Sequence, residues 1–505
     1  MTAMLHHVRR ASVDRQFVAF ILVAAGTGVL IGLTVALVPL ADSRGLIALG
    51  TAMVGGIVAL HGRWLMSTAV FLMFVSPTLL PPLAEVQGFT IRIIDAVAVL
   101  LAAHGIVRIL RRVEGPVLTA SGGRIFGLSA VFLAYVGVTL VIPLQWFPDH
   151  FPVAAISFAR LVSSFALGII IYPLLDRAEN LARIRKIIIA AAFTNGLIAT
   201  AQWIQMGVGS LFHPSMRVGG LLGPDGLGLA GGLLLVLSLP GQGRWADRWQ
   251  RRAGGIGVLL GLLMLLVSKS ASAILAAGAG ASLLLFLNRR PRMARKQLIV
   301  AAVILAVGLA AVVGLRWYDV VGLFEVSGGS FTQRLIVGYS AWLIFLEHPL
   351  LGVGWQTSWA PGVIGDPAVS AQVRQRLGEL PQVLLPEQSP TSVHNLYLQV
   401  LAELGLVGAV LFVAMVVQIT RECRRLLRRS SPVTRRVAVH WTVILVMLGI
   451  WLNTNPLFGG QMAAYLLFLA FAVISAAPRL DRGLVTPAAA LRAQEPGSLE
   501  DVDNG

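Results

Sequence analysis

Apolar runs of membrane-spanning length alternate with short polar segments along almost the whole chain. An α-helix crosses the core of a bilayer with about 20 apolar residues, whereas a strand of an outer-membrane barrel alternates apolar and polar residues over about 10. The pattern therefore predicts transmembrane helices. The apolar stretch 255–287 is too long for one crossing and is divided at the polar sequence SKSAS. The fourteen predicted segments are Phe17–Val38, Arg44–Leu60, Trp64–Leu80, Ile93–Leu110, Ile125–Pro143, Val153–Leu175, Ile187–Ile204, Leu227–Leu239, Gly255–Val267, Ala271–Leu287, Leu298–Leu315, Gly405–Thr420, Val437–Leu452 and Met462–Ala476.

Composition supports this fold class. Of the 505 residues, 56% are hydrophobic and only 12% are charged, against about 25% charged residues in soluble globular chains. We therefore predict an all-α fold, a polytopic transmembrane helical bundle of about 12–14 helices. The net charge of +17 does not indicate a nucleic-acid partner, because the basic residues form short clusters between apolar runs, as the positive-inside rule requires.

The basic residues also predict the orientation of the bundle. With the N-terminus inside, 31 of the 40 Lys and Arg residues fall in segments on the inner side and 8 on the outer side, and this asymmetry sets membrane topology. We expect a cytoplasmic N-terminus at 1–16, transmembrane helices within 17–316 and a long periplasmic loop at 317–404. Further transmembrane helices within 405–476 and a disordered cytoplasmic tail at 477–505 complete the chain, so both termini are cytoplasmic.

The long loop is expected to be partly helical. Ser330 and Gln333 form a capping box, and Pro349 ends the helix that follows. Asp366 caps a second helix with Pro367 in its first position, and this helix is expected on the membrane surface or over the bundle. Its apolar positions share one face and are Val369, Val373, Leu377 and Leu380.

Two arginines on the predicted outer face are candidates for anion binding. Arg217 lies in the glycine-rich segment HPSMRVGGLLGPDGLG. It either donates to an anionic ligand or extends toward lipid phosphate as an interfacial arginine. Arg334 follows the capping box in the first turn of a helix, where the helix dipole disfavours a cation. An anion near that helix start would resolve the conflict, and a tolerated surface arginine is the alternative.

His394 stands where the polar loop turns into an apolar helix. Thr391 and Ser392 can cap that helix, and a helix N-terminus favours a neutral imidazole that can accept a proton. The alternative is a histidine bonded to a loop carbonyl. Glu387 and Glu403 either orient the ring or are solvated.

These outer-face residues together suit a reaction on a lipid-linked diphosphate. The arginines would stabilise charge on the leaving diphosphate and the histidine would take a proton from the attacking hydroxyl. Lys269, in SKSAS, also lies at an outer turn, and anion contact and simple snorkelling are equally compatible with that position.

No motif for a metal or a nucleotide is present. The chain has one cysteine, Cys423, no H-x-x-x-H, no D-x-D in an outer loop and no Walker-type glycine loop on the inner side. We therefore expect no metal, no cofactor and no hydrolysis of ATP.

Two loop segments resemble the signature of the O-antigen ligase and O-antigen polymerase superfamily. They are EHPLLGVGW at 347–355 and HNLYLQVLAELGLVG at 394–408, and Arg334 stands at the expected place before the first. The family pattern runs approximately as R…hPl.GvG followed by HN.yL..l.e.G..G.

Two earlier segments extend the resemblance over 217–408. RVGGLLGPDGLG, starting at Arg217, resembles an outer segment of the family, with Asp225 where asparagine is usual. SKSAS resembles a turn in which Lys269 replaces arginine. The first five or so helices match only in hydrophobicity. These departures bear on donor specificity more than on the type of reaction.

The resemblance implies a GT-C-like membrane glycosyltransferase at the periplasmic face of the bacterial inner membrane. Such an enzyme moves glycan from a polyprenyl-diphosphate donor to an acceptor hydroxyl without a metal, in lipopolysaccharide or exopolysaccharide assembly. Its partners are the lipid-linked donor, a glycan or lipid acceptor and membrane lipid. His394 becomes the base, and Arg217 and Arg334 bind the diphosphate. The further substrate-binding candidates are Lys269, Trp355, Asn395 and Tyr397.

Other functions stay open on the sequence. A ligase transfers finished chains to lipid A–core or another acceptor, whereas a polymerase joins repeat units, and the two signatures overlap. A flippase or transporter of lipid-linked oligosaccharide would have inverted repeats and helices broken at the midplane, and no internal repeat is evident. A membrane scaffold would tolerate alanine at His394.

Overall fold

The computed structural model of the chain describes two short strands at 84–86 and 89–91 and residues 119–175, 178–207, 216–239, 248–288, 330–358, 366–377, 393–456 and 461–480, with isolated residues between them. Five predicted segments lie outside these residues, although the structure describes isolated positions of the last one. They are Phe17–Val38, Arg44–Leu60, Trp64–Leu80, Ile93–Leu110 and Leu298–Leu315. The predicted N-terminal segment 1–16 and most of the tail 477–505 also lie outside them.

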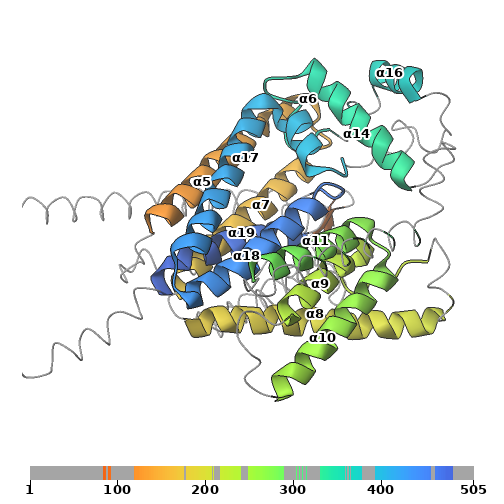
Figure 1. The fold of residues 1–505 in the computed structure, drawn as a ribbon. Helices are drawn as coiled ribbons and strands as arrows, with labels where there is room; N and C mark the ends of the chain where they lie inside the picture. Colours follow the sequence, from red (N-terminus) through yellow and green to blue (C-terminus); the bar gives the residue numbers. More distant parts are fainter. Residues whose placement is uncertain are drawn as a thin grey trace, which may run out of the picture.

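The described chain forms a bundle of helices (Figure 1). Each of the nine predicted apolar segments within the described residues coincides with helical structure, and six of these helices are long and apolar enough to cross a membrane. The helices are α5 (Ala120–Thr139), α6 (Val141–Trp146), α7 (Phe151–Ile171), η1 (Tyr172–Leu175), α8 (Ala178–Met206), α9 (Gly223–Ser238), α10 (Arg248–Ser268), α11 (Ala271–Leu287), α14 (Ser330–Glu347), α16 (Pro367–Leu377), α17 (Leu396–Arg429), α18 (Pro432–Trp451) and α19 (Gln461–Ala476).

A small hairpin departs from the purely helical expectation. Strand β1 (Ala84–Val86) pairs with strand β2 (Phe89–Ile91) in an antiparallel arrangement, with Val86 opposite Phe89. The pattern of apolar residues did not predict these strands, because three residues are too few for an alternation of period two to be detected.

Helix ends gather at two opposite ends of the bundle. Thr119, just before α5, donates from its hydroxyl to the carbonyl of Ser475 near the end of α19 (3.2 Å). Thr434, in the first turn of α18, donates to the carbonyl of Ala477 (3.4 Å). We call this the basic end, because it carries the arginines at the end of α17 and the start of α18, namely Arg421, Arg424, Arg425, Arg428, Arg435 and Arg436.

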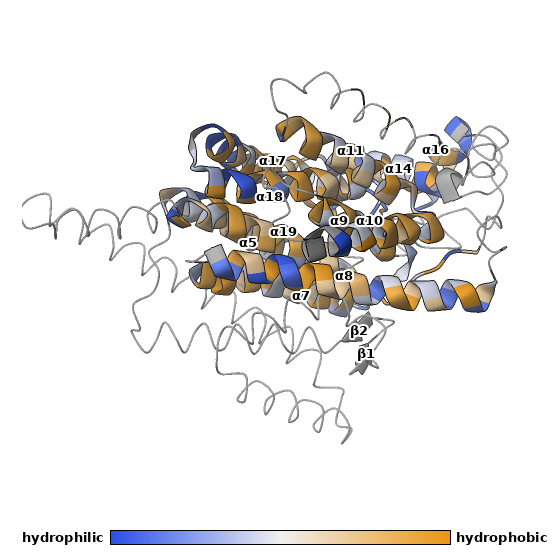
Figure 2. Ribbon diagram, turned by 60° about the horizontal axis from the view of Figure 1, so that its bottom comes forward, coloured by the Kyte–Doolittle hydropathy of each residue, from blue (hydrophilic) through white to orange (hydrophobic). Residues whose placement is uncertain are grey.

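Several helices expose apolar stripes on their outward faces, and Figure 2 shows hydrophobic residues along the outside of the bundle as well as within it. Contiguous apolar surface of this kind does not face water in a soluble monomer, so these stripes face lipid. The protein is an all-α, multi-pass membrane bundle. The stripe on α10 contains Ile256, Leu259, Leu262 and Leu266, and the stripe on α17 contains Leu406, Val410, Val413 and Val417.

Helix α9 is packed closely between α10 and α11 through glycines. A Cβ atom at Gly261 of α10 would lie 2.7 Å from the carbonyl oxygen of Gly231 in α9. A Cβ at Gly228, on another part of α9, would lie 2.6 Å from the side chain of Ala273 in α11. Small residues allow such approach of helix backbones within a membrane. The chain reverses between α10 and α11 at Lys269, so the division of this stretch at SKSAS is confirmed.

Both helices expected in the long loop are present as α14 and α16. The carboxylate of Asp366 accepts from the backbone N–H of Ala368 (2.7 Å), so it caps α16 as predicted. Val369 and Val373 are buried and belong to one apolar cluster with Ile336 of α14. Helix α14 in turn packs against α17, so the loop covers the start of α17.

Helical structure continues beyond the expected start of the C-terminal tail at 477. Residues 478–480 are helical, and Leu480 is buried. The guanidinium of Arg479 lies 4.1 Å from the ring centroid of Tyr172. Helical structure thus continues past the predicted boundary at 477, and the cation of Arg479 stacked on the ring of Tyr172 stabilises this end of the helix.

Candidate active site

The candidate site lies at the end of the bundle opposite the basic end, where the starts of four helices meet. Asp225 is in the first turn of α9, Ser270 immediately precedes α11, and Arg334 lies near the start of α14. The indole Nε1 of Trp451, the last residue of α18, donates to the carbonyl of Asp225 (3.2 Å). His394 lies just before α17. Helix N-termini present unpaired N–H groups and a positive dipole, so this end of the bundle favours anions.

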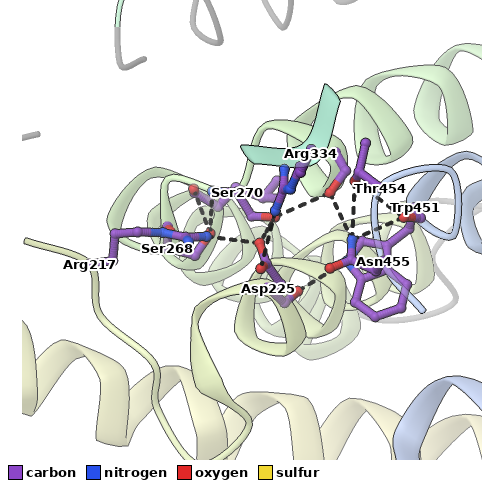
Figure 3. Close-up of polar contacts among 10 residues, drawn as sticks. Arg217, Asp225, Ser268, Ser270, Arg334, Trp451, Thr454 and Asn455 are labelled. Carbon is purple, nitrogen blue, oxygen red and sulfur yellow. Dashed lines mark hydrogen bonds and ion pairs between the residues drawn. The ribbon is translucent and has the colours of Figure 1, made fainter. Parts of the chain in front are cut away.

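The two predicted arginines converge on the carboxylate of Asp225 (Figure 3). A terminal nitrogen of Arg217 lies 2.8 Å from Oδ1 of Asp225, and a terminal nitrogen of Arg334 lies 3.8 Å from Oδ2. The Nε of Arg217 also donates to the carbonyl of Ser268 at the end of α10 (3.0 Å). The hydroxyl of Ser270 donates to Asp225 Oδ1 (2.6 Å). The anion that was predicted near Arg334 at the start of α14 is thus the carboxylate of Asp225, a group of the protein itself.

The segment that carries Arg217 has a backbone that requires glycine. Gly220 and Gly223 have φ values of 56° and 73°, which β-carbons disfavour. Two polar side chains of α8 hold the segment: the Gln202 side-chain oxygen accepts from the N–H of Gly220 (2.9 Å), and Asn195 accepts from that of Leu221 (3.2 Å). The glycines of RVGGLLG therefore shape a turn that presents Arg217 to α9.

Further polar groups connect the turn between α10 and α11 to the end of α18. The hydroxyls of Ser270 and Ser272 lie 3.4 Å apart, and the amide nitrogen of Asn455 donates to Ser272 (3.2 Å) and to the carbonyl of Trp451 (3.0 Å). Lys269 has a φ of 49° and is 1% exposed. A lysine buried to this degree, between two serines of the site, is not a snorkelling residue of the surface.

His394 shares the electrostatic environment of this cluster. Burial lowers the pKa of its imidazole below the usual value, the positive charge of Arg334 lowers the pKa further, and the carboxylate of Asp225 opposes both effects. The ring is therefore neutral at neutral pH and able to accept a proton. The same interactions mean that His394, Arg334 and Asp225 lie within reach of one another's charge.

The cap of α17 is Asn395, not the predicted Thr391 or Ser392. The side-chain oxygen of Asn395 accepts from the backbone N–H groups of Tyr397 (2.9 Å) and Leu398 (3.1 Å), and its nitrogen donates to Asn453 (3.2 Å). The helix starts one residue after Asn395, so His394 directly precedes the cap. Asn395, expected to bind substrate, thus has a structural role as the helix cap that sets the position of His394.

The two signature segments pack against each other where α17 is broken. Gly405 has φ 62° and ψ −162° within α17, which interrupts the helical ladder. The N–H groups of Leu406 and Val407 donate instead to the carbonyls of Pro349 (2.8 Å) and Leu350 (3.2 Å).

Carbonyl groups released by the same break are also paired. The N–H of Val353 donates to the carbonyl of Ala402 (3.0 Å), and the N–H of Gly354 donates to that of Glu403 (2.9 Å). The hydroxyl of Tyr135 donates to the carbonyl of Leu404 (2.9 Å). The segment PLLGVG at 349–354 thus supplies four hydrogen bonds in place of the missing helical ones and holds α17 at this break, with His394 before the helix.

Glu403 neither orients His394 nor is solvated, so both expectations for it were wrong. Its side chain is 0% exposed and accepts from the N–H of Gln356 (2.9 Å) and the hydroxyl of Ser358 (2.7 Å). The carbonyl of Gln356 in turn accepts from Nε2 of His150, just before α7 (2.7 Å). A buried carboxylate that is hydrogen-bonded in this way holds the loop after GVGW in place. Glu387 lies outside the described residues.

The two aromatic candidates lie in different surroundings. Trp355 is 1% exposed and packs in the main hydrophobic core. Tyr397 is 43% exposed, and its hydroxyl donates to the carbonyl of Gly449 in α18 (3.0 Å). Among the described residues, no group of three or more His, Cys, Asp or Glu is placed to hold a metal ion.

Comparison with protein families gives a match over 256–413, just under a third of the chain, to the family described as O-antigen ligase. This match supports the superfamily that the motifs indicated. No curated protein matches the chain. The matched part contains Lys269, Ser270, Arg334 and His394, whereas Arg217 and Asp225 precede it.

Sequence reasoning missed the position of Asp225 at the centre of this site. The residue was noticed only as a departure from the family pattern. Its spacing from Arg217, eight positions, spans a turn and the start of a helix, so no periodicity related the two. A carboxylate in the first turn of a helix whose other residues are apolar was the available signal, because charges near membrane spans are usually paired or functional.

Proposed function

We propose that this protein transfers glycan from a polyprenyl-diphosphate donor to an acceptor hydroxyl at the periplasmic face of the bacterial inner membrane, without a metal, in lipopolysaccharide or exopolysaccharide assembly. The observation that carries the proposal is the convergence of Arg217 and Arg334 on one anionic group, within electrostatic reach of a neutral His394. Two guanidinium groups at one anion site are well suited to a diphosphate.

In the proposed reaction the acceptor oxygen attacks the anomeric carbon of the donor glycan. The bond between this carbon and the phosphate oxygen breaks, and the diphosphate leaves with the bonding electrons. Arg217 and Arg334 stabilise the charge that develops on the diphosphate. An imidazole nitrogen of His394 takes the proton of the acceptor hydroxyl. The donor supplies the free energy, so the reaction needs no nucleotide at the periplasmic face.

The distribution of charge supports the proposed orientation. The basic end carries the arginines of α17 and α18, and such clusters remain in the cytoplasm under the positive-inside rule. The site lies at the other end, which is therefore proposed to be periplasmic, with both termini cytoplasmic. Lys269 and Tyr397 remain proposed substrate contacts, and Trp355 and Asn395 are proposed to act by positioning the loop and α17.

Removal of either arginine is expected to weaken use of the donor. Arg217→Ala and Arg334→Ala should each lower transfer efficiency, kcat/KM for the donor, by about 100-fold, since a charge-assisted contact to a buried anion contributes about 1.5–3 kcal/mol. The measurement is transfer from a polyprenyl-diphosphate glycan by the full chain in lipid nanodiscs. Arg424→Ala, an exposed arginine at the basic end, is the matched control and should retain wild-type efficiency. Equal efficiency in all three variants would refute the proposed diphosphate site.

The rate of transfer is also expected to depend on the protonation of His394. The pKa of its imidazole is lowered, so the neutral base persists below pH 6.5 and the rate should fall only as the pH drops through this lowered pKa. Because the charge of Arg334 contributes to the lowering, Arg334→Gln should move the acidic limb to higher pH. Profiles of kcat against pH for both proteins test this, and a limb that moves to lower pH in the variant would contradict it.

Transport of lipid-linked oligosaccharide remains distinguishable from transfer. A flippase would move the lipid-linked glycan across a vesicle membrane without forming a glycosidic bond. Appearance of a new glycosidic bond in detergent or nanodiscs, where no transport can be measured, would support the proposed transferase.

A further inference from the structure

The carboxylate of Asp225 lies where the proposed site would receive a phosphate. Its Oδ1 contacts both Arg217 (2.8 Å) and the hydroxyl of Ser270 (2.6 Å), and its Oδ2 faces Arg334 at 3.8 Å. The side chains of Arg217, Arg334 and Asp225 are 23%, 18% and 29% exposed. The three groups are thus shielded but still open to water, as an exchangeable anion site requires.

Arg217 already contacts two acceptors of the protein in the absence of a ligand. Its Nε is engaged by the carbonyl of Ser268, and one of its terminal nitrogens by Asp225. A guanidinium binds phosphate best through two parallel N–H groups. A phosphate that engages Arg217 through the terminal nitrogen that contacts Asp225 must share or replace this contact.

Charge leads to the same expectation. A phosphate that approaches both arginines also approaches the carboxylate between them, and like charges brought together in a shielded site repel strongly. The carboxylate must therefore turn away or take up a proton when the phosphate binds. The hydroxyl of Ser270 opposes either change, because it donates its hydrogen bond to the charged form.

Resting on the proposed function, we propose that Asp225 is an internal competitor of the donor diphosphate for Arg217 and Arg334. In the absence of a ligand the carboxylate keeps the two guanidinium groups aligned. When a diphosphate is bound, the carboxylate lowers the affinity of the site for it. The return of the carboxylate to the arginines promotes release of the diphosphate that remains after transfer. Asp225 is accordingly a positioning residue that sets affinity.

Asp225→Asn is the decisive substitution, because asparagine keeps the size of the side chain and an oxygen that accepts from Arg217 and Ser270 but removes the charge. The full-length variant in lipid nanodiscs should bind inorganic pyrophosphate about tenfold more tightly than the wild type or better, which corresponds to about 1.4 kcal/mol. Titration calorimetry without divalent cations measures this. Asp149→Asn, an exposed aspartate before α7, is the matched control and should leave the affinity unchanged.

A second variant addresses the case in which Asp225→Asn does not fold. Ser270→Ala leaves the carboxylate but removes the hydroxyl that holds it, so pyrophosphate should bind a few-fold more tightly. Affinity that is unchanged or weaker in a folded Asp225→Asn or Ser270→Ala protein would overturn the proposal and leave Asp225 with only a structural role.

Failure of this inference can be separated from failure of the proposed function. Arg217→Ala and Arg334→Ala should both lose affinity for pyrophosphate if the anion site exists. If the arginine variants lose affinity for pyrophosphate and Asp225→Asn gains none, the proposal that Asp225 is a competitor is rejected, and the diphosphate site is retained. If the affinity for pyrophosphate is unchanged in both arginine variants, the diphosphate site is rejected, and with it the proposal that Asp225 competes for that site.

Discussion

Replacement of His394 with alanine is expected to lower the rate of glycan transfer by about 10²–10⁴-fold, the usual contribution of a general base. Binding of the donor should change little, because the proposed diphosphate contacts come from Arg217 and Arg334. The loss should therefore appear in kcat rather than in KM for the donor. The measurement is the in vitro transfer assay at saturating donor, with equal amounts of folded protein.

The expected loss follows from the surroundings of His394. Burial and the charge of Arg334 keep the ring neutral by lowering its pKa, and its place before the Asn395 cap puts it at the positive end of α17. Alanine removes the only proposed proton acceptor, so the acceptor hydroxyl must lose its proton to water.

A matched histidine provides the control for this substitution. His348 is exposed near the end of α14, and His348→Ala should transfer glycan at the wild-type rate. Unchanged transfer in His394→Ala would refute the base and favour a scaffold or transporter.

Replacement of Gly405 with alanine is expected to destabilise the protein by about 3 kcal/mol or more. The backbone there, with φ 62° and ψ −162°, belongs to a region that only glycine populates freely. A Cβ atom would also overlap the carbonyl carbon of Leu350 and the amide nitrogen of Gly352. Because both obstacles are backbone atoms, no side-chain rotation relieves the overlap.

The consequences of Gly405→Ala should reach the site as well as the stability. The hydrogen bonds of Leu406 and Val407 to Pro349 and Leu350 depend on this break, and they fix the turns of α17 that follow His394. A lower midpoint of thermal unfolding in detergent should therefore accompany reduced transfer by the protein that remains folded.

Gly123→Ala is the matched control for stability. A Cβ atom at Gly123, within α5, meets nothing within 4 Å, and alanine in a helix is at most about 1 kcal/mol more favourable than glycine. If Gly405→Ala unfolded at the same temperature as Gly123→Ala, the break in α17 would not be the constraint described here.

Local patterns were sufficient to locate the apolar helices within the described residues. The segment Ala271–Leu287 was predicted with the bounds of α11, because serines and lysine interrupt the apolar run just before it. Helix α17 extends beyond the predicted Gly405–Thr420 at both ends. Its polar ends lie outside the apolar pattern, and their helical structure depends on the Asn395 cap and on packing.

Local patterns were insufficient for the partners of charged groups. Glu403 is close to His394 along the chain, yet it is bonded to Gln356 and Ser358. Arg334 is distant from Asp225 along the chain, yet the two side chains face each other. Proximity in sequence was a poor guide in both cases, because the break at Gly405 and the packing of α14 redirect these elements.

The sequence by itself determined that this is a helical, multi-pass membrane protein. It also indicated the O-antigen ligase superfamily and the residues Arg217, Arg334 and His394. These properties depend on apolar length, on the positions of basic clusters and on short motifs, all of which are local. Only the tertiary structure decided that Asp225 stands between the arginines and that Asn395 caps α17. It also decided that PLLGVG at 349–354 replaces the hydrogen bonds that α17 loses at its break. Each of these contacts joins segments whose meeting depends on how the ends of several helices pack together, and no local pattern contains that information.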